Sequence, residues 1–224
     1  MSLNYIIYLA NYSDGILYFL ALLLLVALAV LIDRFWSLRN TILRGKSVIR
    51  AASEMPVLRQ VELAKLLQAS KNLPEEVMIE TTMRYQGVSH ETLASHLDET
   101  IMLIAPSLDR RLWVLDTVVT LAPLMGLFGT IIGMFHAFNV LAQPGHAPAE
   151  VTGGVADALV ATAFGLFIAM LGLAGFNALS NQVRLIVHQL DSLKMMIVNR
   201  TDSASVLPAA RAVNMQGAAH FATV

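Results

Sequence analysis

A few polar side chains interrupt otherwise apolar stretches of this chain, and they are the residues whose types could support chemistry. Thr130 and His136 lie in one such stretch, Thr162 lies in another, and Asp157 stands at the start of the second. A hydroxyl can donate and accept a hydrogen bond, and an imidazole can change its charge near neutral pH. A carboxylate in or beside a membrane helix is costly, so Asp157 is a candidate functional group by default.

Each of these residues also has a purely structural interpretation. A threonine in a membrane helix commonly donates its hydroxyl to a carbonyl of its own helix. Asp157 is close enough to the edge of its stretch to be a solvated residue at a helix N-terminus. His136 can be a packed interfacial side chain instead of a pH-sensitive one. Both interpretations stay open for all four residues.

The motifs of enzymes and metal sites are incomplete in this chain. Gly45–Ser47 ends like a phosphate-binding loop, but Asn40 replaces the first glycine of that pattern, and His90 begins a metalloprotease-like motif in which Ala94 replaces the second histidine. The absence of cysteine excludes thiolate sites, and the net charge of −1 does not indicate a basic nucleic-acid surface. We expect no enzyme activity, no cofactor, no metal and no nucleic-acid partner.

Charge is scarce in the chain and unevenly placed. Only 14% of the 224 residues are charged and 56% are hydrophobic, whereas an average soluble domain is about 25% charged. All 15 lysines and arginines lie in two blocks, 34–111 and 184–211. The other stretches carry three apolar segments close to the roughly 20 residues that span a bilayer. The composition therefore predicts an all-α integral membrane protein with three transmembrane helices and extended cytoplasmic helices.

The placement of positive charge predicts the topology. Cytoplasmic connections of membrane proteins carry an excess of lysine and arginine, so we expect the N-terminus outside and the C-terminus in the cytoplasm. No small-residue cleavage site follows the first apolar segment, which favours an uncleaved anchor. The predicted segments are an outer N-terminal segment (1–15), transmembrane helix 1 (16–32), a cytoplasmic helical region (33–111), transmembrane helix 2 (112–142), an outer loop (143–153), transmembrane helix 3 (154–178), a cytoplasmic helix (179–200) and a mobile tail (201–224).

Two helix starts can be recognised in the charged region. Asn72 is followed by Pro74 and Glu75, which is typical of an N-cap with proline and an acid in the first turn. Ser89 is a second N-cap candidate. From there we expect one helix to continue through Arg110–Arg111 into the second transmembrane helix.

Small residues recur along one face of each of the last two apolar segments. They are Ala122, Gly126, Gly129, Gly133 and Ala137 in the first, and Gly154, Ala158, Ala161, Gly165, Ala169 and Gly172 in the second. Such faces allow helices to approach closely in lipid. We expect the glycines among them to pack between helices of one chain or between copies of it, although a small face can also line something that moves past it.

Two longer segments carry a resemblance to a known family. Residues 121–138 read LAPLMGLFGTIIGMFHAF, and residues 154–166 read GVADALVATAFGL. They resemble the signatures of the second and third membrane helices of the MotA/TolQ/ExbB proton-channel family, and the order of one span, a helical region and two spans is similar as well. The resemblance implies a bacterial inner-membrane motor subunit with Thr130, Thr162 and Asp157 on a proton path.

The resemblance also implies partners. Several copies of the chain, in the family usually a pentamer, surround the single membrane span of a smaller ExbD-like or TolR-like partner that carries a membrane aspartate, and a TonB-like transducer receives the work. Two departures concern the site. Asp157 stands where the family usually has glutamate, and Met170–Leu171 stands where it has isoleucine and proline, which removes a source of helix kinking.

We therefore expect a homo-oligomeric proton-channel subunit that couples the proton gradient to TonB-dependent transport. Two alternatives remain. One is a Tol-Pal-type motor that maintains envelope integrity, and the other is a structural membrane scaffold that conducts no protons. The sequence identifies neither the energised receptor nor the copy number.

Overall fold

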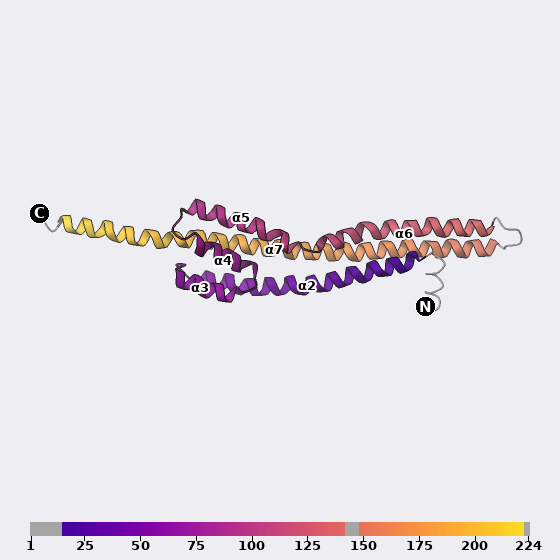
Figure 1. Cartoon of the computed structure of the whole chain (residues 1–224), viewed down its shortest axis with the longest axis horizontal. Helices are drawn as coiled ribbons and strands as arrows, with labels where there is room; N and C mark the ends of the chain where they lie inside the picture. The colour runs from indigo at the N-terminus through magenta and orange to yellow at the C-terminus, as the bar shows by residue number, and fades with distance from the viewer. Residues whose placement is uncertain (1–14, 142–147, 222–224) are drawn as a thin grey trace. The chain divides into compact units, whose positions relative to one another are not determined.

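The computed structural model describes the backbone of residues 15–141 and 148–221 and the side chains of residues 15–139 and 152–200. Over these ranges the chain forms helices joined by short connections, and no strand occurs (Figure 1). The helices are α2 (Ile16–Glu54), α3 (Gln60–Ala69), α4 (Pro74–Arg84), α5 (His90–Leu108), α6 (Leu112–Leu141) and α7 (Pro148–Phe221). The predicted all-α fold class is confirmed for the described residues.

Three helices are long and apolar enough to cross a membrane. The candidate spans lie in Ile16–Glu54, Leu112–Asn139 and Thr152–Arg200, and their most apolar windows have mean hydropathies of 2.8, 2.0 and 2.2. Only 17% to 28% of the residues in these windows are buried within the chain. Most of the apolar surface is therefore free to face lipid or other protein chains, as the membrane prediction requires.

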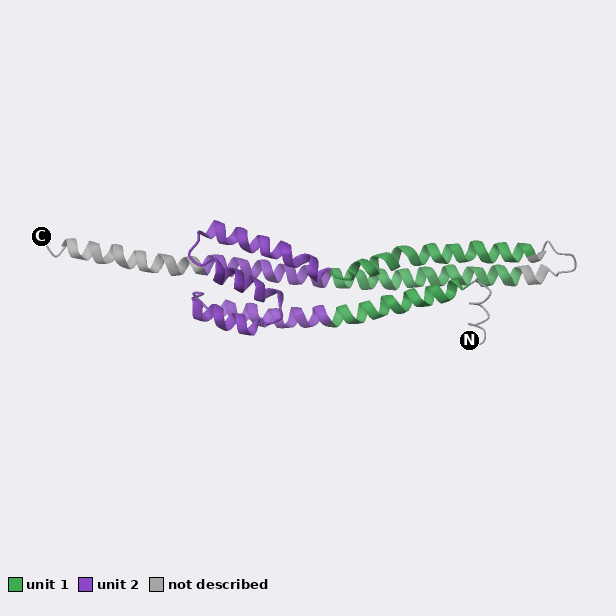
Figure 2. Ribbon diagram, in the orientation of Figure 1, with its two compact units in different colours: residues 1–36, 110–180 green, residues 37–109, 181–224 purple. Residues whose placement is uncertain are grey.

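The chain divides into two compact units, which Figure 2 shows in different colours. We call residues 1–36 and 110–180 the membrane unit, because they contain the apolar stretches of α2, α6 and α7. We call residues 37–109 and 181–224 the bundle unit. The sequence candidates Thr130, Thr162, Asp157 and His136 all belong to the membrane unit.

The bundle unit has a hydrophobic core of its own, to which five helices contribute. α3, α4 and α5 each place apolar residues in it at helical spacing, and they are joined by the later part of α2 and by α7. Its members are Val48, Ala52, Leu58, Leu63, Leu66, Leu73, Met78, Ile79, Leu93, Leu97, Ile101, Leu190, Leu193 and Ile197. Most of them are aliphatic, so burial of apolar surface is the main source of stability for this bundle.

Two polar contacts of α7 strengthen the bundle unit. The guanidinium of Arg200 donates to the backbone carbonyls of Ala52, Ser53 and Met55, which lie at the C-terminal end of α2 where carbonyls lack helical partners. Lys194 Nζ donates to Asp98 Oδ1 of α5 at 2.6 Å, and the lysine side chain is only 20% exposed. α7 is therefore tied to both α2 and α5.

The start of α5 is confirmed, whereas the expected continuation into α6 is wrong. Ser89 is the N-cap of α5, and its Oγ accepts a hydrogen bond from Thr92 N at 3.2 Å. α5 ends at Leu108, and Arg111 has a positive φ of 70° just before α6 begins. Pro106 removes a hydrogen bond from the last turn of α5, and a left-handed residue cannot continue a right-handed helix.

The start of α4 lies one residue later than the sequence suggested. Leu73 is the N-cap, and Asn72 instead has a positive φ of 63°. Asn72 N donates to Glu76 Oε2 at 2.6 Å, so Glu76 is the residue that reaches back to the helix start, as glutamate does at the third position of a helix. The prediction that Asn72 caps the helix was wrong, and Glu75 is left without a capping role.

Four predicted segments fall wholly or partly outside the described residues. Of the outer N-terminal segment only residue 15 is described, and residue 142 of predicted transmembrane helix 2 and residues 143–147 of the expected outer loop lie outside the description. α7 already begins at Pro148, before the predicted start of transmembrane helix 3 at residue 154. α7 extends to Phe221, so its backbone includes most of the expected tail. The side chains of residues 201–224 are not among the described ones, and the mobility of this tail stays a prediction.

Candidate functional site

The small faces of α6 and α7 meet each other at very short range. A Cβ added to Gly165 would lie 2.5 Å from Ala122 O, and one added to Gly126 would lie 2.9 Å from Ala161 O. A Cβ on Gly133 would lie 2.5 Å from the Cβ of Ala158. Since real Cβ contacts are almost never below 3.0 Å, only glycine fits at these positions. The two helices therefore touch backbone to backbone.

A side-chain hydrogen bond joins the same two helices. Thr162 Oγ1 of α7 donates to Gly126 O of α6 at 2.8 Å. The bond depends on the close approach, because a Cβ on Gly126 would lie only 3.0 Å from Thr162 Cα. Thr162 is partly buried, and its oxygen keeps lone pairs that can accept a further hydrogen bond. Thr162 is thus a connection between helices and not a threonine bonded to its own turn.

Thr130 lies one helical turn from that bond. It occupies the position four residues after Gly126 on α6, about 6 Å along the helix. Its side chain is buried, at 9% exposed, and Oγ1 donates to Leu127 O of its own helix at 2.7 Å. Thr130 therefore bonds to its own helix, as the structural interpretation expects. Thr162 lies across the interface, at the level of the preceding turn of α6.

Asp157 and Thr162 lie on opposite sides of the small face of α7. A helix turns by about 100° per residue, which places Asp157 about 40° to one side of Ala161 and Thr162 about 100° to the other side. Ala161 is buried, whereas Asp157 is half-buried. None of the described residues forms a hydrogen bond or an ion pair with its carboxylate. The carboxylate is therefore not neutralised by the described part of the membrane unit.

His136 is placed apart from the threonines. It lies on α6 beyond Gly133, is half-buried, and has its ring tilted against that of Phe135 with centroids 5.9 Å apart. That contact is between sequence neighbours, so it is compatible with a packed side chain. The structure brings Thr162 together with the Gly126 turn of α6.

Sequence reasoning missed three contributions of α2 to the membrane unit. Ile16 packs against Gly129, where a Cβ would lie 3.4 Å from its Cγ2, and Leu31 fills the space beside Gly175. Arg111 Nη1 donates to Asp33 Oδ2 at 2.7 Å, which joins the end of the apolar stretch of α2 to the start of α6. The signal for this ion pair was present, since both charges stand at the ends of predicted spans.

Comparison with known proteins identifies what this arrangement is similar to. A model of the MotA/TolQ/ExbB proton channel family matches residues 69–192, which include the stretches of α6 and α7 around Thr130, Asp157 and Thr162. The chain is 34% identical over 161 residues to the Tol-Pal system protein TolQ of Haemophilus influenzae, a match that covers 69% of this chain and 65% of that protein.

Two further relatives carry the name ExbB. The biopolymer transport protein ExbB of Neisseria gonorrhoeae is 32% identical over 119 residues, 51% of this chain and 54% of that protein. The putative biopolymer transport protein ExbB-like 1 of Synechocystis is 27% identical over 172 residues, 75% of this chain and 68% of that protein. The match covers less than two thirds of the length of the TolQ and gonococcal ExbB relatives.

Proposed function

Because this chain belongs to the MotA/TolQ/ExbB proton channel family, we propose that it is the channel subunit of a proton-driven motor that energises an envelope protein in TonB-dependent transport. The observation that carries this proposal is the family match over residues 69–192. It includes both helices of the glycine-lined interface and the polar groups beside it. The relatives named biopolymer transport protein ExbB support the TonB-dependent role.

The proposed location is the bacterial inner membrane, with the N-terminus outside and the C-terminus in the cytoplasm. The support is the placement of all 15 lysines and arginines in 34–111 and 184–211. With this orientation every one of them is on the cytoplasmic side, as the positive-inside rule requires. The bundle unit is then cytoplasmic, which agrees with its charged surface and its separate core.

The proposed proton path uses Thr130, Thr162 and Asp157. Thr162 donates to Gly126 O and can accept a hydrogen bond at the same time, so a proton can be passed on when its hydroxyl rotates. Thr130 has the same capacity one turn along α6. Asp157 is the carboxylate at the edge of the span and is the chain's own group for binding a proton there. His136 is a further candidate because an imidazole can bind and release a proton.

This set of groups requires a partner. Two hydroxyls and one edge carboxylate do not make a complete relay across a membrane. We therefore propose a homo-oligomer, a pentamer as is usual in the family, around an ExbD-like or TolR-like span that supplies a second carboxylate. A TonB-like transducer then receives the work. The largely exposed apolar windows of all three spans leave ample surface for contacts with copies and with lipid.

A Tol-Pal-type role is the second candidate, and one observation favours it. The TolQ relative matches 69% of this chain at 34% identity, whereas the gonococcal ExbB matches 51% at 32%. Both roles use the same proton path, so they differ in the envelope protein that is driven. A host strain that lacks its own ExbB or its own TolQ separates them, because the chain restores either TonB-dependent uptake or resistance to detergents.

The proton path is tested with Thr162→Val and Thr130→Val in the complex with its partner. Valine keeps the shape of threonine but cannot carry a proton, so we expect loss of energised uptake or of envelope integrity with the oligomer still assembled. Assembly is measured by the mass of the detergent-solubilised complex. Thr162→Ser restores the hydroxyl and is expected to recover activity.

Thr120→Val is the matched control for both variants. Thr120 is an exposed threonine of α6 whose hydroxyl bonds to carbonyls of its own helix, so the same substitution there is expected to keep activity. If both path variants assemble and work as well as this control, the protein is a scaffold in which the small faces only pack, and the proton path is wrong.

A further inference from the structure

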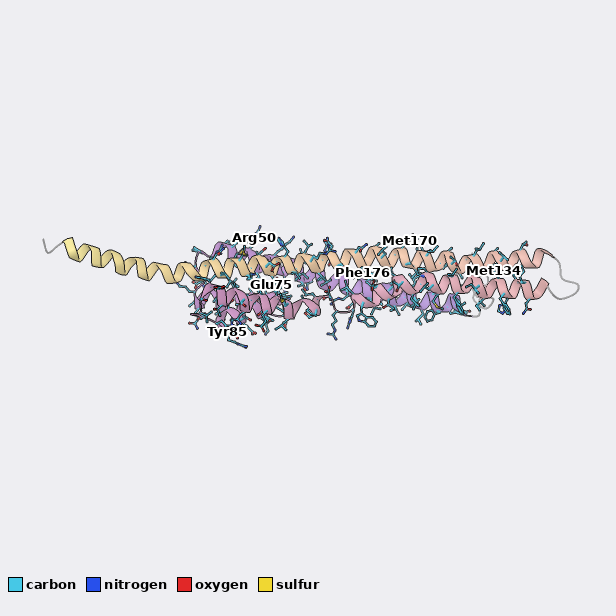
Figure 3. All side chains as sticks on the ribbon, turned by 90° about the horizontal axis from the view of Figure 1, so that it is seen from above. Arg50, Glu75, Tyr85, Met134, Met170 and Phe176 are labelled. Atoms are coloured by element: carbon cyan, nitrogen blue, oxygen red, sulfur yellow. The ribbon has the colours of Figure 1, made fainter. Side chains whose placement is uncertain are left out.

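Glu75 is a buried acid that lies outside the proposed proton path. It occupies α4 in the bundle unit and is labelled in Figure 3. Its side chain is 0% exposed, and within the described residues neither carboxylate oxygen has a hydrogen-bond partner. Ionised glutamates are almost never buried in this way unless they are paired. The environment of Glu75 therefore needs a physical explanation.

Gly45 of α2 and Gln189 of α7 form the surroundings of this carboxyl group. A Cβ on Gly45 would overlap Glu75 Oε1 and would lie 3.0 Å from Gln189 Oε1. Both oxygens therefore lie over the same glycine, whose missing side chain makes room for them. Gln189 is 9% exposed, and its Oε1 has no hydrogen-bond partner among the described residues. Two buried acceptors from different helices thus approach the same glycine.

A proton on Glu75 resolves this arrangement. The acid form of a carboxyl group has a hydroxyl that donates a hydrogen bond. With Gln189 Oε1 as the acceptor, this bond satisfies both groups at once. Reversing the Gln189 amide does not satisfy both groups. Its Nε2 now donates to Ile42 O at 3.4 Å, and after reversal Oε1 would face that carbonyl oxygen instead. Burial raises the pKa of the Glu75 carboxyl above its ordinary value of 4.5, which favours the same form.

The charged groups around Glu75 do not replace this proton. Burial raises the pKa of Glu75 more than two other groups lower it, which are the backbone N–H of Glu75 itself and then the positive charge of Arg44 on α2. Arg44 Nη2 itself donates to Lys71 O at 2.9 Å in the connection between α3 and α4. On α4, the carboxylate of Glu76 accepts from Asn72 N. α7 presents Gln189, which is a neutral amide.

We propose that Glu75 is a proton-binding site of the bundle unit, whose acid form donates a hydrogen bond to Gln189 and thereby fastens α4 to α7 over Gly45. Loss of the proton leaves a buried charge opposite an acceptor and loosens α4. The proposal rests on the geometry of the bundle alone, so it stands or falls independently of the proton path in the membrane unit. Glu75 would then be a second proton-binding group of this chain, one whose protonation changes the packing of α4.

The direction of the pH effect follows from linkage. The folded state holds the Glu75 proton more tightly than the unfolded state, so its contribution to stability is complete below about pH 4.5 and decreases as the pH rises through the folded pKa. The equilibrium constant for local opening of α4 is expected to rise about tenfold per pH unit between the ordinary pKa and the folded-state pKa of Glu75. Above the folded pKa the increase stops.

Hydrogen exchange of the full chain in nanodiscs tests the proposal. The rate is measured for residues 74–84 between about pH 5 and pH 8 and divided by the intrinsic exchange rate at each pH. The wild type is expected to show the rise, whereas Glu75→Gln keeps the neutral form and is expected to show none. Glu80→Gln is the matched control, since Glu80 is an exposed glutamate of the same helix and its variant should keep the wild-type slope.

Infrared difference spectra give a second readout that a merely structural role would not change. The carbonyl band of a protonated carboxylic acid is expected in the wild type and in Glu80→Gln, and absent in Glu75→Gln. Gln189→Met should keep this band but shift it, because the acid has lost its acceptor. Any one of three results would overturn the proposal. They are equal slopes in the wild type and Glu75→Gln, an acid band that Glu75→Gln does not remove, and failure of Glu75→Gln to fold.

Discussion

Gly165→Ala is the substitution that tests the backbone contact between α6 and α7 most directly. The new Cβ would lie 2.5 Å from Ala122 O and 3.1 Å from Gly126 Cα, whereas ordinary contacts begin at 3.4 Å. A backbone carbonyl cannot rotate out of the way, so the helices must separate by about 0.9 Å at this level. The 2.8 Å hydrogen bond from Thr162 to Gly126 would lengthen beyond useful range.

The magnitude follows from three contributions. Overpacking of a close contact costs about 1–3 kcal/mol, and a lost hydrogen bond between membrane helices costs about 0.6 kcal/mol. Alanine in place of glycine regains up to about 1 kcal/mol of helix propensity. When the full helix propensity is regained, we therefore expect Gly165→Ala to destabilise the membrane unit by about 0.6–2.6 kcal/mol.

Gly153→Ala is the matched control, on the same helix but with open space around it, since nothing lies within 4 Å of its added Cβ. It is expected to be neutral or stabilising by up to about 1 kcal/mol. Both variants are unfolded with sodium dodecyl sulfate in mixed micelles, and helicity is followed by circular dichroism. If Gly165→Ala is as stable as Gly153→Ala, the helices are not in backbone contact and the reasoning from the small faces is refuted.

Two further predictions concern the bundle unit. Arg200→Met removes the charged donor from the carbonyls that end α2, so about 1–3 kcal/mol of local stability should be lost. The loss is measured as faster hydrogen exchange in the last turn of α2. Arg50→Met, at an exposed position of that helix, should not have this effect, and equal exchange in the two variants would contradict the assigned role. A double-mutant cycle of Lys194→Met and Asp98→Asn should give a coupling below about 1 kcal/mol, because the aspartate is half exposed; a markedly larger coupling would mean that the pair is far better shielded from solvent.

Local signals predicted the elements of this fold well. Ser89 caps α5 because a serine side chain can satisfy a free amide of the first turn without any tertiary contact. The three apolar segments were recognisable because membrane length and hydropathy are properties of the segment itself. These same segments, at the length of membrane-spanning helices, were sufficient for the all-α class.

Features that depend on neighbouring helices were not predictable in the same way. The sequence indicated Asn72 as the N-cap of α4, but the structure has Leu73 at that position and Glu76 as the acid that reaches back to Asn72 N. Glu75 is an acid of the first turn of α4, as predicted, but nothing in the sequence shows that its carboxyl group lies beside Gly45 and Gln189. The small faces indicated close packing, but only the structure pairs Gly126 with Thr162.

The backbone contact between α6 and α7 limits how this chain can diverge. In most protein interfaces a larger residue on one side can be accommodated by a smaller one on the other. At Gly165 the opposing group is the carbonyl of Ala122, and at Gly126 it is that of Ala161, and a main-chain atom has no smaller replacement. Substitutions here have no compensating partner, so the interface can drift only if the two helices first move apart.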